Sequence, residues 1–186
     1  MLLINIFFAL ALLLRFYTLS ISIRNEKNLL KKGAIQYGKK NSIALSAIHI
    51  LFYLSCIIEA NYNQVIFNIE ANYNQVIFNK ESQIGLMILI FSLIMLFYVI
   101  YQLKEIWTVK VYILPNHKIN TSFIFKYFRH PNYFLNIIPE LIGLSLLCQA
   151  KLTAMFILPL YMIILAIRIM QEEKAMKCLF KENHNI

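Results

Sequence analysis

The chain has 186 residues, of which 60% are hydrophobic and 15% charged, and its mean hydropathy is +0.62. This composition excludes a soluble globular protein and predicts an integral membrane protein. Only four glycines and four prolines are present, so we expect helices throughout and a single all-α polytopic domain over residues 1–186. Cys56, Cys148 and Cys178 lack ligand spacing, so neither a disulfide framework nor a metal site is expected.

Five apolar stretches approach the length of about 20 residues that a helix needs to cross a bilayer. They cover residues 1–23, 43–59, 84–103, 132–148 and 152–170. The first has no preceding basic region and no following cleavage site of small residues. We therefore interpret it as a retained span and not as a signal peptide, and we expect about five transmembrane helices.

Basic residues are concentrated in alternate loops. Segments 24–42 and 104–131 contain six and five Lys and Arg residues, and the tail from residue 168 contains four, whereas 60–83 and 149–151 contain one each. Because cytoplasmic loops retain Lys and Arg, we expect the N-terminus outside and the C-terminus in the cytoplasm. The net charge of +9 then reflects topology and contact with anionic membrane lipids, and no nucleic-acid motif is visible.

The predicted outer loop contains a perfect tandem repeat. The eleven residues IEANYNQVIFN at 58–68 recur without a change at 69–79. A solenoid would require at least three longer units, so this repeat is typical of a recent duplication in a loop, where extra length costs little. We expect residues 58–79 to form either a longer exterior loop or an extra helical segment, because eleven residues make almost three helical turns.

Polar chemistry is concentrated at Arg129-His130-Pro131, where a basic loop enters the fourth apolar stretch. Pro131 suits the first turn of a helix, since it lacks the N–H group that would be unpaired there. Arg129 and His130 then flank a helix N-terminus, which attracts anionic ligand groups. The alternative interpretation is a snorkelling arginine beside a capping histidine.

Glu140 lies inside the same apolar stretch, about two turns after Pro131. An ionisable side chain at this depth is costly and usually faces a cavity or a partner, which predicts a functional residue. The alternative is a protonated glutamic acid that hydrogen-bonds a neighbouring helix. Arg15, in the first span, either lines the same pocket or pairs with another helix.

A second polar cluster ends the fifth span. Arg168 and Glu172 are four residues apart and face the same way on a helix, whereas Glu173 is rotated by about 100°. One acid is therefore expected to pair with Arg168 and the other to stay available to a ligand. The alternative is a solvated helix end with an internal ion pair.

Together these two clusters resemble the isoprenylcysteine carboxyl methyltransferase family of integral membrane enzymes. The matching residues are FKYFRHPNYFLNIIPE at 125–140 and RIMQEE at 168–173. Segments RFYTLSISIRNEKNLLKKGAIQYG at 15–38 and WTVKVYILPNHKI at 107–119 look like the bacterial branch that includes alkylpyrone O-methyltransferases. Two positions depart from the pattern: Gln36 replaces an acid, and residues 121–123 replace a glycine-containing turn.

The resemblance implies S-adenosylmethionine as cofactor, held by the C-terminal part at 104–186. Arg129 or Arg168 would hold its carboxylate, Glu172 or Glu173 its ammonium or ribose, and the RHP motif and the following tyrosine its adenosyl portion. The cofactor-binding residues implied are Arg129, His130, Pro131, Tyr133, Arg168, Glu172 and Glu173.

The same resemblance implies methyl transfer to an oxygen of a lipophilic acceptor that enters from the bilayer. A carboxylate acceptor needs no base, whereas a hydroxyl or enol acceptor does, and Glu140 or His130 would then be the catalytic base. A bacterial inner-membrane location with the cofactor site facing the cytoplasm agrees with the loop charges. The alternatives are a phospholipid-type N-methyltransferase and a non-catalytic transporter or scaffold with a buried ion network.

Overall fold

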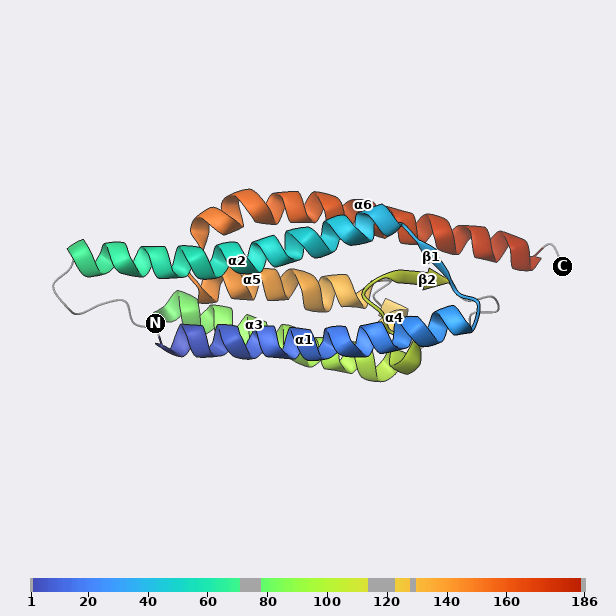
Figure 1. The fold of residues 1–186 in the computed structure, drawn as a ribbon, viewed down its shortest axis with the longest axis horizontal. Helices are drawn as coiled ribbons and strands as arrows, with labels where there is room; N and C mark the ends of the chain where they lie inside the picture. Colours follow the sequence, from blue (N-terminus) through green and yellow to red (C-terminus); the bar gives the residue numbers. More distant parts are fainter. Residues whose placement is uncertain (1, 71–77, 114–122, 128–129, 185–186) are drawn as a thin grey trace.

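Long helices run side by side along the longest axis of the molecule (Figure 1). The computed structural model describes residues 2–70, 78–113, 123–127 and 130–184. The long helices are α1 (Leu2–Lys31), α2 (Lys39–Glu70), α3 (Lys80–Leu103) and α6 (Lys151–His184). A shorter helix, α5 (Ile138–Leu147), continues from a π-helical segment, η2 (Asn132–Ile137), and short helices η1 (Lys104–Ile106) and α4 (Phe123–Tyr127) lie nearby.

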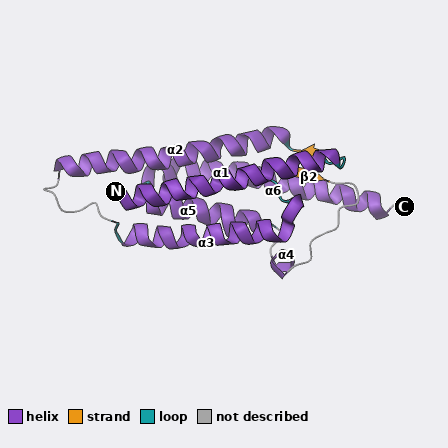
Figure 2. Cartoon of the chain, turned by 60° about the horizontal axis from the view of Figure 1, so that its bottom comes forward, coloured by secondary structure: helices purple, strands orange, loops and turns teal. Residues whose placement is uncertain are grey.

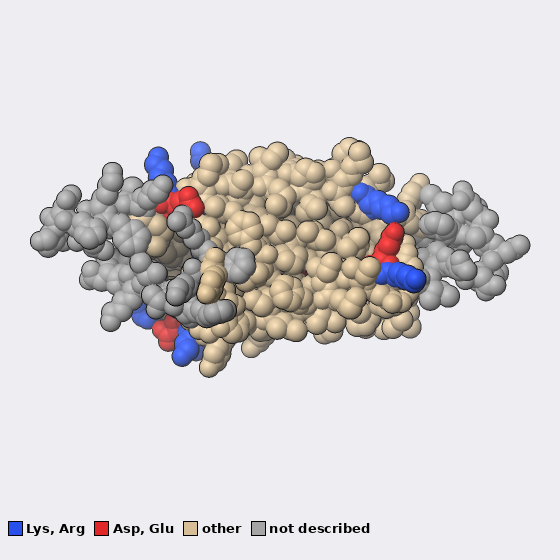
Figure 3. Space-filling model, turned by 180° about the vertical axis from the view of Figure 1, so that it is seen from behind, with Lys and Arg blue, Asp and Glu red and all other residues tan. Residues whose placement is uncertain are grey.

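The prediction of an all-α membrane protein is confirmed. In the part of the chain that the structure describes, four helical stretches are long and apolar enough to cross a bilayer, and a shorter apolar stretch matches the fourth predicted span. On the face shown in Figure 3, charged side chains lie near the two ends and the surface between them is uncharged. The stretches are Leu2–Lys31, Lys39–Asn63, Lys80–Ile106 and Lys151–Met176, with Asn132–Leu147 as the shorter one.

The inward face of α1 changes character along the helix. Its buried residues follow the spacing of three and four that keeps side chains on one face of a helix. They are Ile4, Phe8, Ala11, Thr18, Ser22, Asn25 and Leu29. The first three are apolar and the next three are polar. The C-terminal half of α1 therefore faces a polar interior. The helix ends at Lys31, and Gly33 follows it with a φ of 82°, which suits a residue without Cβ.

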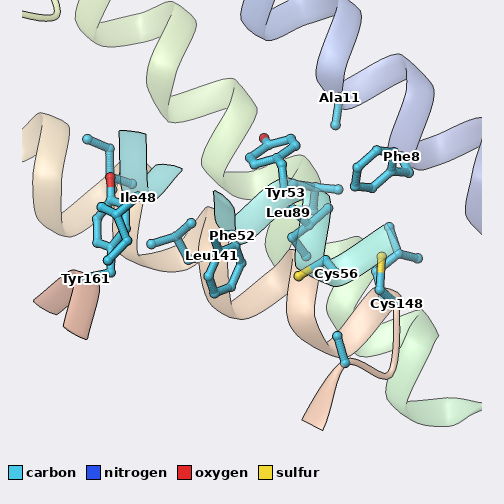
Figure 4. Packing of buried hydrophobic residues seen from close by; sticks show 14 of the residues in the cluster. Phe8, Ala11, Ile48, Phe52, Tyr53, Cys56, Leu89, Leu141, Cys148 and Tyr161 are labelled. Atoms are coloured by element: carbon cyan, nitrogen blue, oxygen red, sulfur yellow. The ribbon is translucent and has the colours of Figure 1, made fainter. Parts of the chain in front are cut away.

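The apolar core lies in the other half of the bundle. Figure 4 shows its side chains converging from α1, α2, α3, α5 and α6. The labelled members are Phe8, Ala11, Ile48, Phe52, Tyr53, Cys56, Leu89, Leu141, Cys148 and Tyr161. Helices α3 and α5 approach closely through two glycines: a Cβ on Gly143 would lie 2.7 Å from the Leu89 nitrogen and 2.9 Å from the Gly85 oxygen.

Two short strands depart from the purely helical prediction. Strand β1 (Ile35–Tyr37) pairs antiparallel with β2 (Val111–Ile113), and Gln36 lies opposite Tyr112. Figure 2 places this pair at the end of the bundle that also holds the C-terminal end of α6. The pairing joins the α1–α2 connection to a segment far along the chain, so its stability depends on a tertiary contact.

Half of the predicted outer loop is helical. The first copy of the repeat, 58–68, continues α2 as far as Glu70, so α2 extends beyond its neighbours (Figure 1). Residues 71–77, in the second copy, lie outside the described residues. Glu59 from the first copy accepts hydrogen bonds from the backbone nitrogens of Leu152 at 2.7 Å and Thr153 at 2.8 Å, and therefore caps the start of α6.

Candidate functional site

Arg168 is the centre of a buried polar cluster at the β1–β2 end of the bundle. Its side chain is 1% exposed. The guanidinium donates through Nη1 to Ser42 Oγ of α2 at 2.5 Å and through Nη2 to the Val109 carbonyl at 3.2 Å. Its Nε lies 3.2 Å from Glu172 Oε1 and 3.3 Å from the Tyr133 hydroxyl. One arginine thus joins α2, η2, α6 and the segment before β2.

Glu172 is held from both sides. Its Oε1 accepts from the Tyr133 hydroxyl and from Arg168, and its Oε2 lies 3.2 Å from His130 Nδ1. The His130 ring stacks on Tyr133 with centroids 5.8 Å apart, and its Nε2 lies 3.6 Å from Oε1 of Glu173. The hydrogen bond to Glu172 raises the pKa of His130, although burial opposes this. The imidazolium is therefore stabilised between two carboxylates.

The two acids differ as the sequence predicted. Glu172 pairs with Arg168 one helical turn away, whereas Glu173 is 41% exposed and contacts only His130 among the contacts that the structure describes. Pro131 begins the helix with a φ of −62°, and the His130 carbonyl accepts from the Tyr133 and Phe134 nitrogens at 3.1 and 3.2 Å. His130 thus caps this helix and also faces the acids.

Helix α1 holds the segment at 104–112 against this cluster. Asn25 donates to the carbonyls of Lys104 and Trp107, each at 2.9 Å, and Ser22 accepts from the Val109 nitrogen at 2.9 Å. Glu26 accepts from Lys110 Nζ at 2.7 Å and from the Tyr112 hydroxyl. The pKa of Tyr112 is raised by burial and by this carboxylate. The polar face of α1 therefore positions Val109 for its contact with Arg168.

Several buried polar atoms at this end have no hydrogen-bond partner among the described residues. They are Asn41 Oδ1, Trp107 Nε1, His130 Nε2 and Gln171 Oε1. Gly38, with a φ of 61°, lies directly against Gln171, and any Cβ there would meet the amide of that side chain. Because buried polar groups in proteins are normally paired, a group of open donors and acceptors at one end suits a polar ligand.

Glu140 belongs to a second cluster and not to the first. It is fully buried, forms an ion pair with Arg15 of α1 and accepts a hydrogen bond from the Tyr53 hydroxyl of α2. Arg15 also donates to Asn136 Oδ1 at 3.1 Å. Glu140 lies seven residues after Tyr133, about 10 Å further along the helical segment.

Sequence reasoning identified most, but not all, of the residues in these clusters. His130, Pro131, Tyr133, Arg168, Glu172 and Glu173 come together in the first cluster, whereas Arg129 lies outside the described residues. Residues that were not anticipated are Gly38, Ser42, Tyr53, Asn136 and Gln171. Only Gly38 carried a local signal, as a glycine between a strand and a helix; the others depend on tertiary contacts.

The fold and the clusters define a multi-pass α-helical membrane protein with an ionic site at one end of its bundle. Residues 84–178 match the isoprenylcysteine carboxyl methyltransferase (ICMT) family, and the chain belongs to this family. The matched half of the chain includes η2, α5 and the acids of α6. Membership supports a membrane methyltransferase, in agreement with the resemblance drawn from the two motifs.

Two relatives extend the similarity over almost the whole chain. An uncharacterized protein of Haemophilus influenzae is 64% identical over 183 residues, which cover 98% of this chain and 100% of the relative. The uncharacterized protein YpbQ of Bacillus subtilis is 26% identical over 160 residues, which cover 86% of this chain and 88% of the relative. No solved structure matches the chain.

Proposed function

We propose that this protein is an S-adenosylmethionine-dependent methyltransferase that methylates an oxygen of a lipophilic acceptor. The observation that carries the proposal is the gathering of open buried polar atoms around the cluster of His130, Arg168 and Glu172 at one end of an otherwise apolar bundle. The family supplies the reaction class. Acceptor access from the bilayer and a cytoplasmic cofactor site in a bacterial inner membrane are parts of the same proposal.

The residues present fit the polar groups of S-adenosylmethionine. Glu173 is exposed enough to accept from an ammonium group or a ribose diol, and Gln171 Oε1 is a buried acceptor without a partner among the residues described. His130 Nε2 lies 3.6 Å from Glu173 and has no hydrogen-bond partner among the described residues, and it donates when the ring is protonated. Arg168 is already engaged through all three of its nitrogens, so we assign it to positioning Glu172 and assign the carboxylate grip to Arg129.

When bound, the cofactor supplies an electrophilic methyl group on a positively charged sulfur. The protein's own contribution is alignment in a site that excludes water. Tyr133 and Arg168 hold Glu172 in one orientation, and Glu172 in turn orients His130. Glu140, about two turns deeper, is the base that we assign to a hydroxyl or enol acceptor, because it lies on the side from which a lipophilic molecule would arrive.

The cofactor proposal is tested by equilibrium binding of radiolabelled S-adenosylmethionine to the purified protein. Arg129→Ala is expected to weaken binding at least about tenfold, the cost of losing a hydrogen bond to a charged group. Glu172→Ala is also expected to weaken binding, because His130 loses the carboxylate that orients it. Glu105→Gln is the control, because Glu105 is 71% exposed and pairs only with Lys32 among the described residues. Absence of saturable binding, or equal binding by all four proteins, would favour a non-catalytic membrane protein with a buried ion network.

The acceptor is tested separately, in lipid extracts from cells with and without the protein. A methyl-labelled cofactor precursor is supplied, and labelled lipids are identified by mass. Label on an oxygen of a lipophilic hydroxyl, enol or carboxyl compound supports the proposal. Label on a phospholipid amine would instead establish the N-methyltransferase alternative.

A further inference from the structure

A pair of opposite charges lies in the middle of the apolar bundle, away from the ionic end. Arg15 is close to the midpoint of α1, and Glu140 and Tyr53 are close to the midpoints of the apolar stretches Asn132–Leu147 and Lys39–Asn63. Ion pairs buried at such depth are expensive and rarely justified by stability alone. Their presence here in a family of membrane methyltransferases calls for a role in the reaction.

The two members of this pair differ in access. Glu140 is 0% exposed, whereas the side chain of Arg15 retains 17% of its surface. Glu140 is held by Arg15 Nε at 2.5 Å and by the Tyr53 hydroxyl, so both of its partners are hydrogen-bond donors. Arg15 is therefore the member of the pair with surface that a bound molecule can contact.

A chain of side-chain amides leads from this pair toward the ionic end. Arg15 donates to Asn136, and Asn136 Nδ2 donates to Asn132 Oδ1 at 3.1 Å. Asn132 is next in sequence to Tyr133, whose hydroxyl contacts Glu172. The Arg15–Glu140 pair and the proposed cofactor site thus lie along the same helical segment, about two turns apart.

We infer that Arg15 binds the oxygen of the proposed hydroxyl or enol acceptor as an anion. The inference rests on the proposed methyltransferase function and deepens it. The acceptor gives its hydroxyl proton to Glu140, and its oxyanion takes the place of the carboxylate as the partner of Arg15. Charge within the apolar site stays balanced, because one carboxylate is neutralised as one oxyanion forms. An amine acceptor would offer Arg15 no negative partner.

The complete step balances in atoms and electrons. The acceptor oxygen forms a bond to the methyl carbon while the carbon–sulfur bond of the donor breaks, and that electron pair remains on sulfur. The product is a neutral methyl ether, which no longer attracts Arg15. Glu140 then releases its proton to solvent and the ion pair with Arg15 forms again.

Other titratable groups surround the pair. His49 of α2 and Tyr161 of α6 share a hydrogen bond of 3.1 Å and lie within electrostatic range of Arg15. Tyr53 contacts both members, and Cys56 lies within electrostatic range of Tyr53. Arg15 is the cation of this group, which makes it the residue to test.

The test uses a nitrophenol with a long alkyl chain, whose phenolate form absorbs visible light, and it requires no cofactor. Its ionisation is titrated by absorbance in the presence of the purified wild-type protein, Glu140→Gln, and the double variant Arg15→Met with Glu140→Gln. Glu140→Gln and the double variant differ only at residue 15. Because both lack the Glu140 carboxylate, removal of Arg15 leaves no buried carboxylate without a partner. Arg24→Met is the control for removing an arginine from α1, because Arg24 is exposed.

The titration midpoint of the bound probe is expected about 1–3 pH units below its value in empty detergent, the effect of a nearby opposite charge. Wild type, Arg24→Met and Glu140→Gln should all show this shift, and the double variant should lose it. An unchanged shift in the double variant would overturn the inference. Cofactor binding is measured on the same samples: its absence from the wild type would refute the proposed function, whereas loss of the probe shift with cofactor binding intact isolates the role of Arg15.

Discussion

At the scale of single residues, ionic contacts decide which side chains have a chemical role. The resemblance implied that Arg129 or Arg168 holds a carboxylate, but Arg168 is buried and donates to acceptors in four parts of the chain. In the proposed function it orients Glu172, and through it His130. Glu173, which helical spacing turns away from Arg168, is the acid with free surface. Burial therefore separates two adjacent glutamates into a positioning group and an available group.

The protonation of His130 is the first testable consequence at this scale. Because its pKa is raised above the ordinary value of 6.5 by Glu172, the contact stabilises the folded protein below about pH 6.5 and is lost as pH rises through the folded-state pKa. An NMR titration of the histidine ring is expected to show a midpoint above 6.5. Glu172→Gln should move the midpoint toward 6.5.

Two further samples make the titration decisive. His130→Asn identifies the resonance among the four histidines of the chain, and Glu105→Gln removes an exposed carboxylate without a described contact to the ring. An equal shift in Glu105→Gln would mean that general surface charge, and not the Glu172 contact, sets the value. A wild-type midpoint below 6.5 would contradict the site geometry.

Residue types alone revealed which side chains were unusual, but not their partners. Glu140 and Arg15 were both recognisable as ionisable groups in apolar stretches, yet 125 positions separate them. Local spacing relates only residues about one turn apart, and the pairing of Arg168 with Glu172 was accordingly predictable. The pairing of Arg15 with Glu140 was not, because it depends on how the helices are arranged in the bundle.

At the scale of elements, the duplicated segment shows how an insertion can be accommodated. The first copy supplies Glu59, which caps α6, and Asn63, which donates to the Gln149 carbonyl. The second copy supplies Phe78, which packs against Phe7, and Asn79, whose side chain caps α3. These four roles occupy positions two, six, ten and eleven of the same eleven-residue unit, so one copy contains all of them.

Deletion of one copy is therefore expected to leave thermal stability and cofactor binding unchanged, within about 1 kcal/mol for the shorter loop. Gln149 bridges Asn63 and Ser82, so the end of α2 is already close to the start of α3. Removal of 58–68 or of 69–79 produces the same protein, because the two copies are identical. Its stability is measured by thermal unfolding in detergent, and its cofactor affinity by equilibrium binding.

The capping role of Glu59 provides the control for the deletion. Glu59→Gln should lower the melting temperature equally in the full-length and the single-copy proteins, since it weakens an interaction with the first turn of α6 worth about 1 kcal/mol. A larger loss of melting temperature in only one of the two proteins would show that the single copy does not cap both α6 and α3. A single-copy protein that fails to bind the cofactor would contradict the expectation outright.

Elements differed in how well the sequence predicted them. The five helical segments followed from hydropathy, because a bilayer requires long apolar stretches with satisfied backbone groups. Strands β1 and β2 have only three residues each and pair across the bundle, so no local pattern indicated them. The π-helical turn at 132–137 was predicted only as helix; its wider turn places Tyr133 and Asn136 in the interior.

At the scale of the whole molecule, the charge distribution predicts the orientation in the membrane. The basic loops at 24–42 and 104–131 and the tail from residue 168 should face the cytoplasm. A fluorescent protein that folds only in the cytoplasm is expected to be bright when fused to the C-terminus. When it is exported in unfolded form at the N-terminus, it is expected to be dark.

A reversed variant checks the cause of this orientation. Replacing lysines of the 24–42 loop by glutamine, and adding lysines to 149–151, removes the asymmetry in loop charge and should reduce the fluorescence of the C-terminal fusion. A dark C-terminal fusion on the unaltered chain would place the ionic end outside the cell. The proposed cytoplasmic cofactor site would then be untenable.

The sequence by itself determined the membrane class, the approximate spans, the family and the residue types of the ionic site. It could do so because hydropathy and short motifs depend on neighbours along the chain. Only the tertiary structure decided that Arg168 is buried against Ser42 and Val109, that Arg15 neutralises Glu140, and that open polar atoms gather near Gly38. Burial and ion pairing depend on which helices meet, and in a bundle those contacts join residues more than a hundred positions apart.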